Sequence, residues 1–439
     1  MRRTLPLALL LAPTVLAAQL PNPSLRGLAL GGSYTVLARG YEATAWNPAL
    51  LGARGNPGFT LGLDGQLEFG SNSYGLNDFQ KYAGSTLSPA DKTYLLSKID
   101  TSLDLRTSVG ISPVGMSIGP LAVSLGTASY GTFGLGKDAV DLALNGSATR
   151  TNPFTLAGSH GSGWAATTLA ASIGIPIPMP LGHLSVGATY KKVWGNGLMQ
   201  AGEISSSFAS YPLINANGTG QALYTNYPTG FDPSKKPMDV FSSNGSPGSG
   251  YGVDVGGVLD LPGGLRVGAT LVNALGSMTW DASRLTYERT TYTVTQTTSG
   301  SVTNPPPTRT TLVGSQIDTD PVAKAFKDSL LAHGSFAKLA RVGASVHLGG
   351  LLLVGEGQLR LSSGLDNQPQ QAVSAGAEYV LLGVLPLRAG IGTDFSNALT
   401  FSAGTGLYVG PIHIDVGASD VSSSTRSGVR VGAGFSLMF

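Results

Sequence analysis

Charged side chains recur in this chain at alternate positions of segments whose other positions are apolar. Between residues 59 and 70, Asp64 and Glu68 share one strand face with other polar residues, while leucine and phenylalanine occupy the opposite face. If such strands cross a bilayer, a charge facing lipid costs about 2–4 kcal/mol at the midplane, so the charges should face the interior of a closed sheet. The interior charges predicted in this way are Asp64, Glu68, Arg106, Asp254, Arg266, Arg341, Glu356, Arg360, Glu378, Arg388, Asp394, Asp415 and Arg430.

Both signs occur among these interior charges, which limits what they could do. A dedicated anion or cation pore would carry rings of charge of one sign. Mixed signs favour structural ion-pair networks, with a role in solute selectivity as the alternative.

Residue types that carry catalysis or bind metals are present but are not arranged for either. The five histidines lack the spacing of a His-Glu-x-x-His zinc motif, and Gly161-Ser162-Gly163 is not the G-x-S-x-G nucleophile elbow. Cysteine is absent, which removes thiolate ligands, thiol nucleophiles and disulfides. We therefore expect no enzymatic activity, no catalytic residue, no metal and no cofactor.

The composition is typical of a membrane barrel and not of a soluble domain. Only 12% of the 439 residues are charged, whereas charged residues make up about 25% of soluble proteins. Glycine accounts for 62 of the 439 residues, about twice its share of about 7% in soluble proteins. Thr107–Gly136 and Thr151–Tyr190 lack Asp, Glu, Lys and Arg, but Pro, Gly, Ser and Thr interrupt both, so neither predicts a spanning helix. The net charge is +2 without a basic stripe, which gives nucleic-acid binding no support.

The first residues have the three parts of a secretory signal peptide. Arg2 and Arg3 form a basic region, Leu5–Leu16 forms a short apolar region, and two alanines follow it. The apolar run is too short to span a bilayer comfortably, which favours cleavage over an N-terminal anchor. We expect a signal peptide over residues 1–18.

Fourteen segments alternate apolar and polar residues with the period of a strand, and most are long enough to cross a bilayer at a tilt. Long connections at 71–102, 133–162, 196–249 and 277–337 alternate with short ones at 113–119, 176–182, 262–264 and 349–350. This rhythm is typical of outer-membrane barrels, whose outer loops are long and whose periplasmic turns are short. The expected strands are 59–70, 103–112, 120–132, 163–175, 183–195, 250–261, 265–276, 338–348, 351–362, 371–381, 386–395, 398–409, 411–421 and 428–439.

Local signals predict more detail in the connections. A capping box at Ser88–Asp91 and a helix start at Asp320 predict short helices in two outer loops, either as lids over the barrel mouth or as simple loop packing. The Thr-rich runs at 287–298 and 308–317 are expected to pair as a ribbon beyond the membrane. Prolines at 176, 178 and 180 are expected to stop the fourth strand, because a central strand cannot continue through them.

The final segment carries an apolar face with aromatic residues near its end. Phe435 and Phe439 alternate with small and polar residues, and Phe439 is the last residue. A terminal aromatic of this kind resembles the signal by which bacterial barrels are recognised for outer-membrane assembly. We therefore expect Phe435 and Phe439 to act as an assembly signal and the barrel assembly machinery to be a partner.

Residues 27–52, before the first strand, form a segment of a different kind. It is rich in Gly and Ala and contains Trp46-Asn47-Pro48-Ala49-Leu50. This resembles the N-terminal hatch of the FadL-type long-chain fatty acid transporters, a superfamily that also includes PorV-like secretion barrels. The resemblance implies that Asn47, Pro48 and Ala49 are plug residues, flanked by Trp46 and by Leu50, which stands where the family commonly has Gly.

The size of the expected barrel also favours a plug. Barrels of about 8 strands are filled by their own side chains, whereas those of 16–18 leave a channel. A lumen of fourteen strands would therefore leak unless occupied, and residues 19–56 could fill it; a disordered leader is the alternative. The expected organisation is a signal peptide at 1–18, a periplasmic hatch at 19–56 and an all-β transmembrane barrel at 57–439.

The resemblance implies uptake of small hydrophobic, fatty-acid-like molecules across the outer membrane of a bacterial cell, with lipid and an apolar ligand as partners. In the FadL-type family such ligands bind near the mouth and leave sideways through the wall. The alternative is a structural or secretion-associated barrel, as in the PorV-like branch, that binds protein through its outer loops.

Overall fold

The computed structural model describes residues 24–439, except for 148–149, 151, 181, 211, 226–245, 363, 366–369, 396–397 and 424–426. The expected signal peptide at 1–18 and the first five residues of the expected hatch lie outside the described residues.

Fourteen antiparallel strands form a closed ring, as predicted. Each strand pairs with its neighbour, and β1 closes the ring by pairing with β18 from Thr60–Met438 to Ser71–Ser427. Every predicted strand is confirmed, to within a few residues at most ends. The ring consists of β1 (Phe59–Ser71), β2 (Ser102–Ile118), β3 (Leu121–Gly136), β4 (His160–Met179), β5 (Gly182–Ala209), β7 (Gly248–Asp260), β8 (Leu265–Trp280), β12 (Leu339–Leu348), β13 (Leu351–Arg360), β14 (Gln371–Leu381), β15 (Leu385–Thr393), β16 (Ala398–Val409), β17 (Ile412–Ser423) and β18 (Ser427–Met438).

The alternation of residues gives the ring an apolar outer surface and a polar inner one. In β1, Leu63 and Leu67 are 51% and 48% exposed on the outside, whereas Asp64 and Gln66 are 7% and 6% exposed on the inside. A broad exposed apolar surface is stable in lipid and not in water, so the ring is a transmembrane barrel. Among the described residues no helix is both long enough and apolar enough to cross a bilayer.

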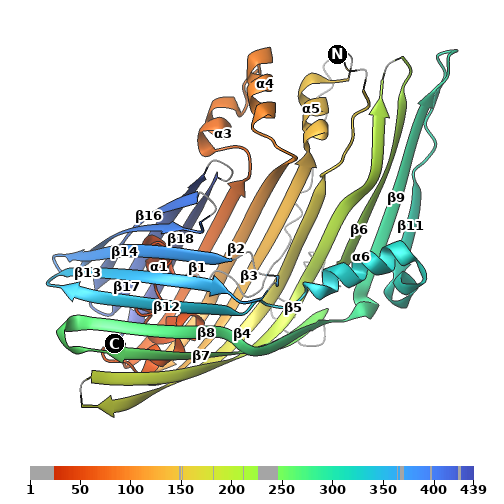
Figure 1. Ribbon diagram of the computed structural model, residues 1–439. Helices are drawn as coiled ribbons and strands as arrows, with labels where there is room; N and C mark the ends of the chain where they lie inside the picture. Colours follow the sequence, from red (N-terminus) through yellow and green to blue (C-terminus); the bar gives the residue numbers. More distant parts are fainter. Residues whose placement is uncertain are drawn as a thin grey trace.

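The wall is much taller on one side than on the other (Figure 1). Strand β5 has 28 residues, whereas β15 has 9. Beyond the ring, β5 continues and pairs with an extension of the same sheet, formed by β6 (Asn215–Thr225), β9 (Leu285–Gln296), β10 (Val302–Thr303) and β11 (Thr308–Val313). The predicted Thr-rich ribbon is therefore confirmed as β9 paired with β11, while the pairing of β9 with β6 was not predicted.

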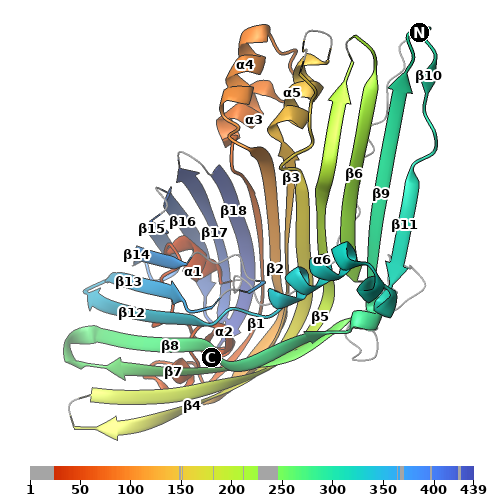
Figure 2. The same ribbon diagram turned by 45° about the vertical axis from the view of Figure 1, so that its right-hand side comes forward.

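Short helices lie on the long-loop end of the barrel (Figure 2). The two predicted from capping signals are α4 (Pro89–Ser97) and α6 (Pro321–Ala332). Two more, α3 (Leu76–Tyr82) and α5 (Lys137–Asn145), were not predicted, because both begin after glycine and not after a capping side chain. The turns contain η4 (Pro262–Gly264), η5 (Ala282–Arg284) and η6 (Gly314–Thr319).

The expectation that prolines stop the fourth strand was wrong. Strand β4 continues through Pro176 and Pro178, which pair with Ser185 and His183 of β5. Its pairing with β3 ends at Ile173, so beyond this point β4 is an edge strand. An edge tolerates proline, because the missing N–H can fall on the side without a partner.

The N-terminal segment, residues 24–56, lies inside the ring (Figure 2). It contains four short helical turns: α1 (Leu25–Ala29), η1 (Gly40–Glu42), α2 (Ala43–Trp46) and η2 (Pro48–Gly52). Most of its residues are buried, and it packs on the inner faces of strands from both halves of the ring.

Candidate functional site

The half of the lumen nearer the long loops holds an apolar cluster beneath α6, which we call the outer apolar cluster. Its members come from the inner face of the tall wall, from the β9 sheet, and from η6 and α6. Tyr287 and Ile317 are fully buried within it, and Trp164 is 7% exposed. The buried members are Ala128, Trp164, Ala166, Val193, Leu198, Leu223, Met278, Leu285, Tyr287, Ile317, Ala323 and Leu330.

A buried ion pair lies next to this cluster on β5. Lys191 is two residues from Val193 of the cluster, and its Nζ is 2.5 Å from Oδ1 of Asp254 on β7. Both side chains are 4% exposed. The inner face of β5 thus changes from apolar to charged between two successive inward-facing residues, Val193 and Lys191.

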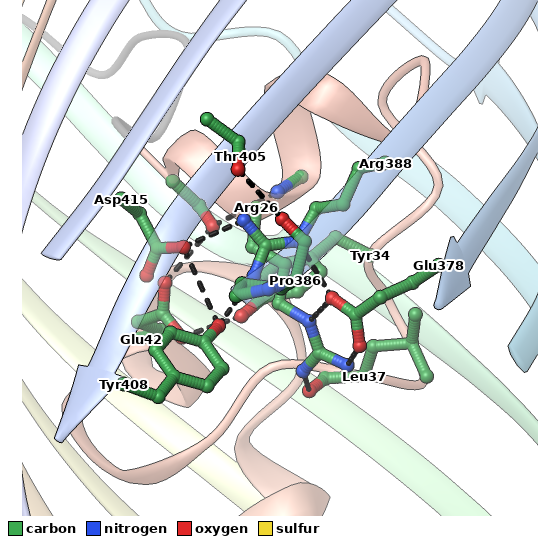
Figure 3. A network of polar contacts seen from close by, with 12 residues as sticks. Arg26, Tyr34, Leu37, Glu42, Glu378, Pro386, Arg388, Thr405, Tyr408 and Asp415 are labelled. Atoms are coloured by element: carbon green, nitrogen blue, oxygen red, sulfur yellow. Dashed lines mark hydrogen bonds and ion pairs between the residues drawn. The ribbon is translucent and has the colours of Figure 1, made fainter. Parts of the chain in front are cut away.

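The charges form a continuous network between the N-terminal segment and the wall (Figure 3). Arg26 of α1 donates to both carboxylate oxygens of Glu378 on β14, at 2.8 and 2.7 Å. Arg388 on β15 donates to the same carboxylate at 2.6 Å and to Asp415 on β17 at 2.6 Å, and it also donates to the Tyr408 hydroxyl. Shared carboxylates and bidentate arginines hold both partners in fixed positions.

A second set of contacts joins the N-terminal segment to itself and to β1. The Tyr34 hydroxyl donates to Glu42 at 2.6 Å, and Ser24 donates to the other oxygen of that carboxylate at 2.9 Å. The Tyr41 hydroxyl donates to Asp64 of β1 at 2.6 Å. Between these groups and the ends of β16, β17 and β18 lies a small polar pocket, lined by residues that include Arg39, Tyr41, Glu42, Asp64, Tyr408, His413 and Asp415.

The three plug residues implied by the resemblance, and the two residues that flank them, lie together inside the ring. The Asn47 side chain donates to the Gly257 and Ala269 carbonyls of β7 and β8, at 3.3 and 3.4 Å, and accepts from the Ala49 amide at 3.1 Å. Pro48, Ala49 and Leu50 are buried. The Trp46 ring packs edge-on against Tyr34, and the Arg341 guanidinium lies 4.8 Å from the centre of the Trp46 ring system.

Some of the predicted interior charges contact this segment directly, and others do not. Glu356 accepts from the backbone amides of Tyr34 and Thr35, both at 2.8 Å. Arg266 donates to the carbonyls of Val36 and Arg54. A further group of predicted charges lies nearer the long loops: Glu68 accepts from Arg430 with Arg106 close by, Arg360 ends β13 and Asp394 follows β15.

Sequence reasoning missed the residues of the N-terminal segment that contact these charges. Arg26 lies in α1, Tyr41 and Glu42 lie in η1, and Tyr34 lies between them. These helical turns are too short for a period to assign a side chain to a face. Tyr408 was missed because an aromatic residue on a strand gives no sign that its hydroxyl joins an ion-pair network. The available signals were Arg26 and Glu42, which are charges in otherwise uncharged stretches.

Other predicted features fall outside this network. Phe435 is 39% exposed and Phe439 is 68% exposed, and the Phe439 ring lies 5.9 Å from that of Phe59. A role for these phenylalanines in assembly stays a prediction. Over the described part of the chain, no group of three or more His, Asp or Glu residues is placed to hold a metal ion.

A closed ring of fourteen strands, apolar outside and occupied inside by its own N-terminal segment, defines a transmembrane barrel, and the expected FadL-type fold is confirmed. By sequence the chain belongs to a family of unknown function, DUF5723, whose model matches residues 48–332. No curated protein matches the chain.

Solved structures of similar fold cover nearly the whole chain. The toluene transporter TbuX of Ralstonia pickettii has a TM-score of 0.50 at 13% identity, over 95% of this chain and 98% of its own. The monoaromatic hydrocarbon channel CymD has a TM-score of 0.48 at 12% identity, over 97% and 98% of the two chains. A FadL homologue of Pseudomonas aeruginosa has a TM-score of 0.48 at 10% identity, over 97% and 100%.

Proposed function

We propose that this protein admits small hydrophobic molecules across the outer membrane of a bacterial cell. The observation that carries the proposal is the outer apolar cluster, buried between the tall wall and α6. A site for apolar molecules needs contiguous apolar and aromatic side chains shielded from water, with few polar groups. The cluster meets this description at the end of the barrel where the long loops lie.

A layer of buried charges below the cluster limits the path that such a molecule can take. Lys191, Asp254 and the network around Arg388 are buried and charged. An apolar molecule gains nothing from this layer and would have to displace ion pairs to pass it. The proposed route therefore enters beneath α6 and leaves from the apolar half of the lumen toward the bilayer, while the N-terminal segment keeps polar solutes out.

The test is uptake by purified protein in lipid vesicles. Naphthalene and hexadecanoate should enter faster than into protein-free vesicles, and sucrose should not. Trp164→Lys, which places a charge in the cluster, should abolish the protein-dependent part of uptake, whereas Lys324→Gln on the exposed face of α6 should not. Equal rates with and without the protein would contradict the proposal.

A further inference from the structure

The inner wall carries a ring of glycines at the height of the N-terminal segment, which we call the glycine belt. Its clearest members come from six different strands, and at each of them the space of the missing side chain is taken by the segment. They are Gly115 of β2, Gly174 of β4, Gly187 of β5, Gly256 of β7, Gly376 of β14 and Gly390 of β15.

At each belt glycine a Cβ atom would lie under 3.0 Å from the segment, so the neighbouring atoms would have to shift. A Cβ atom at Gly187 would lie 2.4 Å from the Pro48 carbonyl carbon, and one at Gly390 would lie 2.2 Å from the Gly31 amide nitrogen. Both neighbours are backbone atoms, which cannot rotate away as the end of a flexible side chain can. The wall is therefore shaped to the path of this particular segment.

The match extends beyond shape to polar groups. Glu378 pairs with Arg26, Glu356 accepts from the amides of Tyr34 and Thr35, and Asp64 accepts from Tyr41. These acceptors come from the neighbouring strands β13 and β14 and from the more distant β1, so contacts on different parts of the ring would have to break together for the segment to move. Removing one partner from a single buried ion pair is already strongly destabilising.

We infer that the N-terminal segment is a permanent core of the barrel: the ring closes around it during folding, and it stays seated while cargo passes. The second clause rests on the proposed function, whereas the first does not. The segment then seals the lumen as a fixed part of the wall and not as a plug that opens.

The folding clause is tested by adding one methyl group at the belt. Gly187→Ala and Gly390→Ala should each lower the yield of heat-modifiable, folded barrel by about ten-fold or more, as overpacking against rigid neighbours predicts. Gly126→Ala is the matched control, because this glycine of β3 has no heavy atom within 4 Å of its Cβ position. Wild-type yields from both belt variants would overturn the inference.

A deletion combined with a belt substitution distinguishes two causes of a low yield: a clash between the added methyl group and the segment, and a need for the segment in folding. If the segment were dispensable, deleting residues 24–52 would leave a folded barrel and would rescue Gly390→Ala by removing the clashing backbone. We expect neither result: the deletion alone should give no folded barrel. Folded barrel from either deletion variant, detected by heat-modifiable mobility and by strand content in circular dichroism, would overturn the folding clause.

The passage clause is tested by fixing the segment to the wall. The chain has no cysteine, so an engineered pair is the sole disulfide. The Ser33 and Ser374 hydroxyl oxygens are 2.7 Å apart, as are those of Thr44 and Ser124. We expect both double cysteine variants, once oxidised, to take up naphthalene within about two-fold of their reduced forms and of the single cysteine controls.

The outcomes distinguish this inference from the function on which it rests. Loss of uptake on oxidation, restored by reduction, would show that the segment must move and would overturn the passage clause. If even the wild type takes up no naphthalene, the proposed function fails, while the glycine and deletion variants still decide whether the segment is a folding core.

Discussion

Glu378 lies between two arginines that are far apart in the sequence. Arg26 and Arg388 both donate to its carboxylate, and the Arg388 side chain is fully buried. Buried charges are stable only when paired, and pairing across elements fixes the position of one element on another. This carboxylate thus connects the N-terminal segment to β15 through β14, so its loss should be felt throughout the ring.

We predict that Glu378→Gln lowers the free energy of unfolding of the barrel by about 3–5 kcal/mol, because two buried guanidinium groups lose their shared anion. Equilibrium unfolding in urea, in detergent or lipid vesicles, measures the change. The control is Asp328→Asn, which breaks an exposed pair with Lys324 on α6 and should leave the transition unchanged. Equal midpoints for Glu378→Gln and wild type would contradict the assigned role.

Helix α6 covers the outer apolar cluster, and one residue both caps it and ties it to the ribbon. Asp320 accepts from the amides of Val322 and Ala323, at 2.9 and 3.0 Å, and from Arg289 of β9 at 2.9 Å. The hydrogen bond from the Ala323 amide and that from Arg289 hold the pKa of the Asp320 carboxyl below its usual value. Since Asp320 is an N-cap, the start of α6 depends on this side chain.

The sign of the pH effect follows from the lowered pKa. A carboxylate stabilised in the folded state contributes fully above its unfolded pKa of about 4, and the contribution is lost as the pH falls through the folded value. We predict that hydrogen exchange at the first turn of α6 accelerates below about pH 4 relative to the helix interior. In Asp320→Asn, which keeps a capping oxygen but cannot ionise, that acceleration should be absent; an unaltered pH profile would contradict the assignment.

The whole barrel is asymmetric in height and in the length of its connections. The tall wall of β3, β4 and β5 continues into the β6 and β9 sheet, and the helical loops lie at the same end (Figure 1). The opposite end has tight turns such as Pro262–Gly264. By the rule that outer loops are long, the tall end should face the outside of the cell.

This orientation predicts a labelling pattern that the absence of native cysteine makes simple to test. A membrane-impermeant thiol reagent applied to intact cells should modify Ser299→Cys at the tip of the ribbon but not Pro262→Cys in the opposite turn. Both should react after the outer membrane is permeabilised. Labelling of Pro262→Cys alone in intact cells would reverse the orientation.

The sequence by itself determined the strands, their order and the inward side of each, because alternation is a local property with a period of two. That is why Asp64, Glu356 and Arg388 could be assigned to the interior without knowledge of their partners. It also determined the two helices with capping side chains and the Thr-rich ribbon, since capping and cross-strand pairing follow from residues near in the sequence.

Only the tertiary structure decided which charged side chains form ion pairs with each other. Arg26 and Glu378 are 352 positions apart, and their contact depends on the ring closing and on an irregular segment lying at one height within it. The same closure decided that Pro176 and Pro178 lie on an unpaired edge and that glycines on separate strands form one belt. No local pattern encodes these outcomes, because they depend on how long each strand continues beside its neighbour and on what fills the lumen.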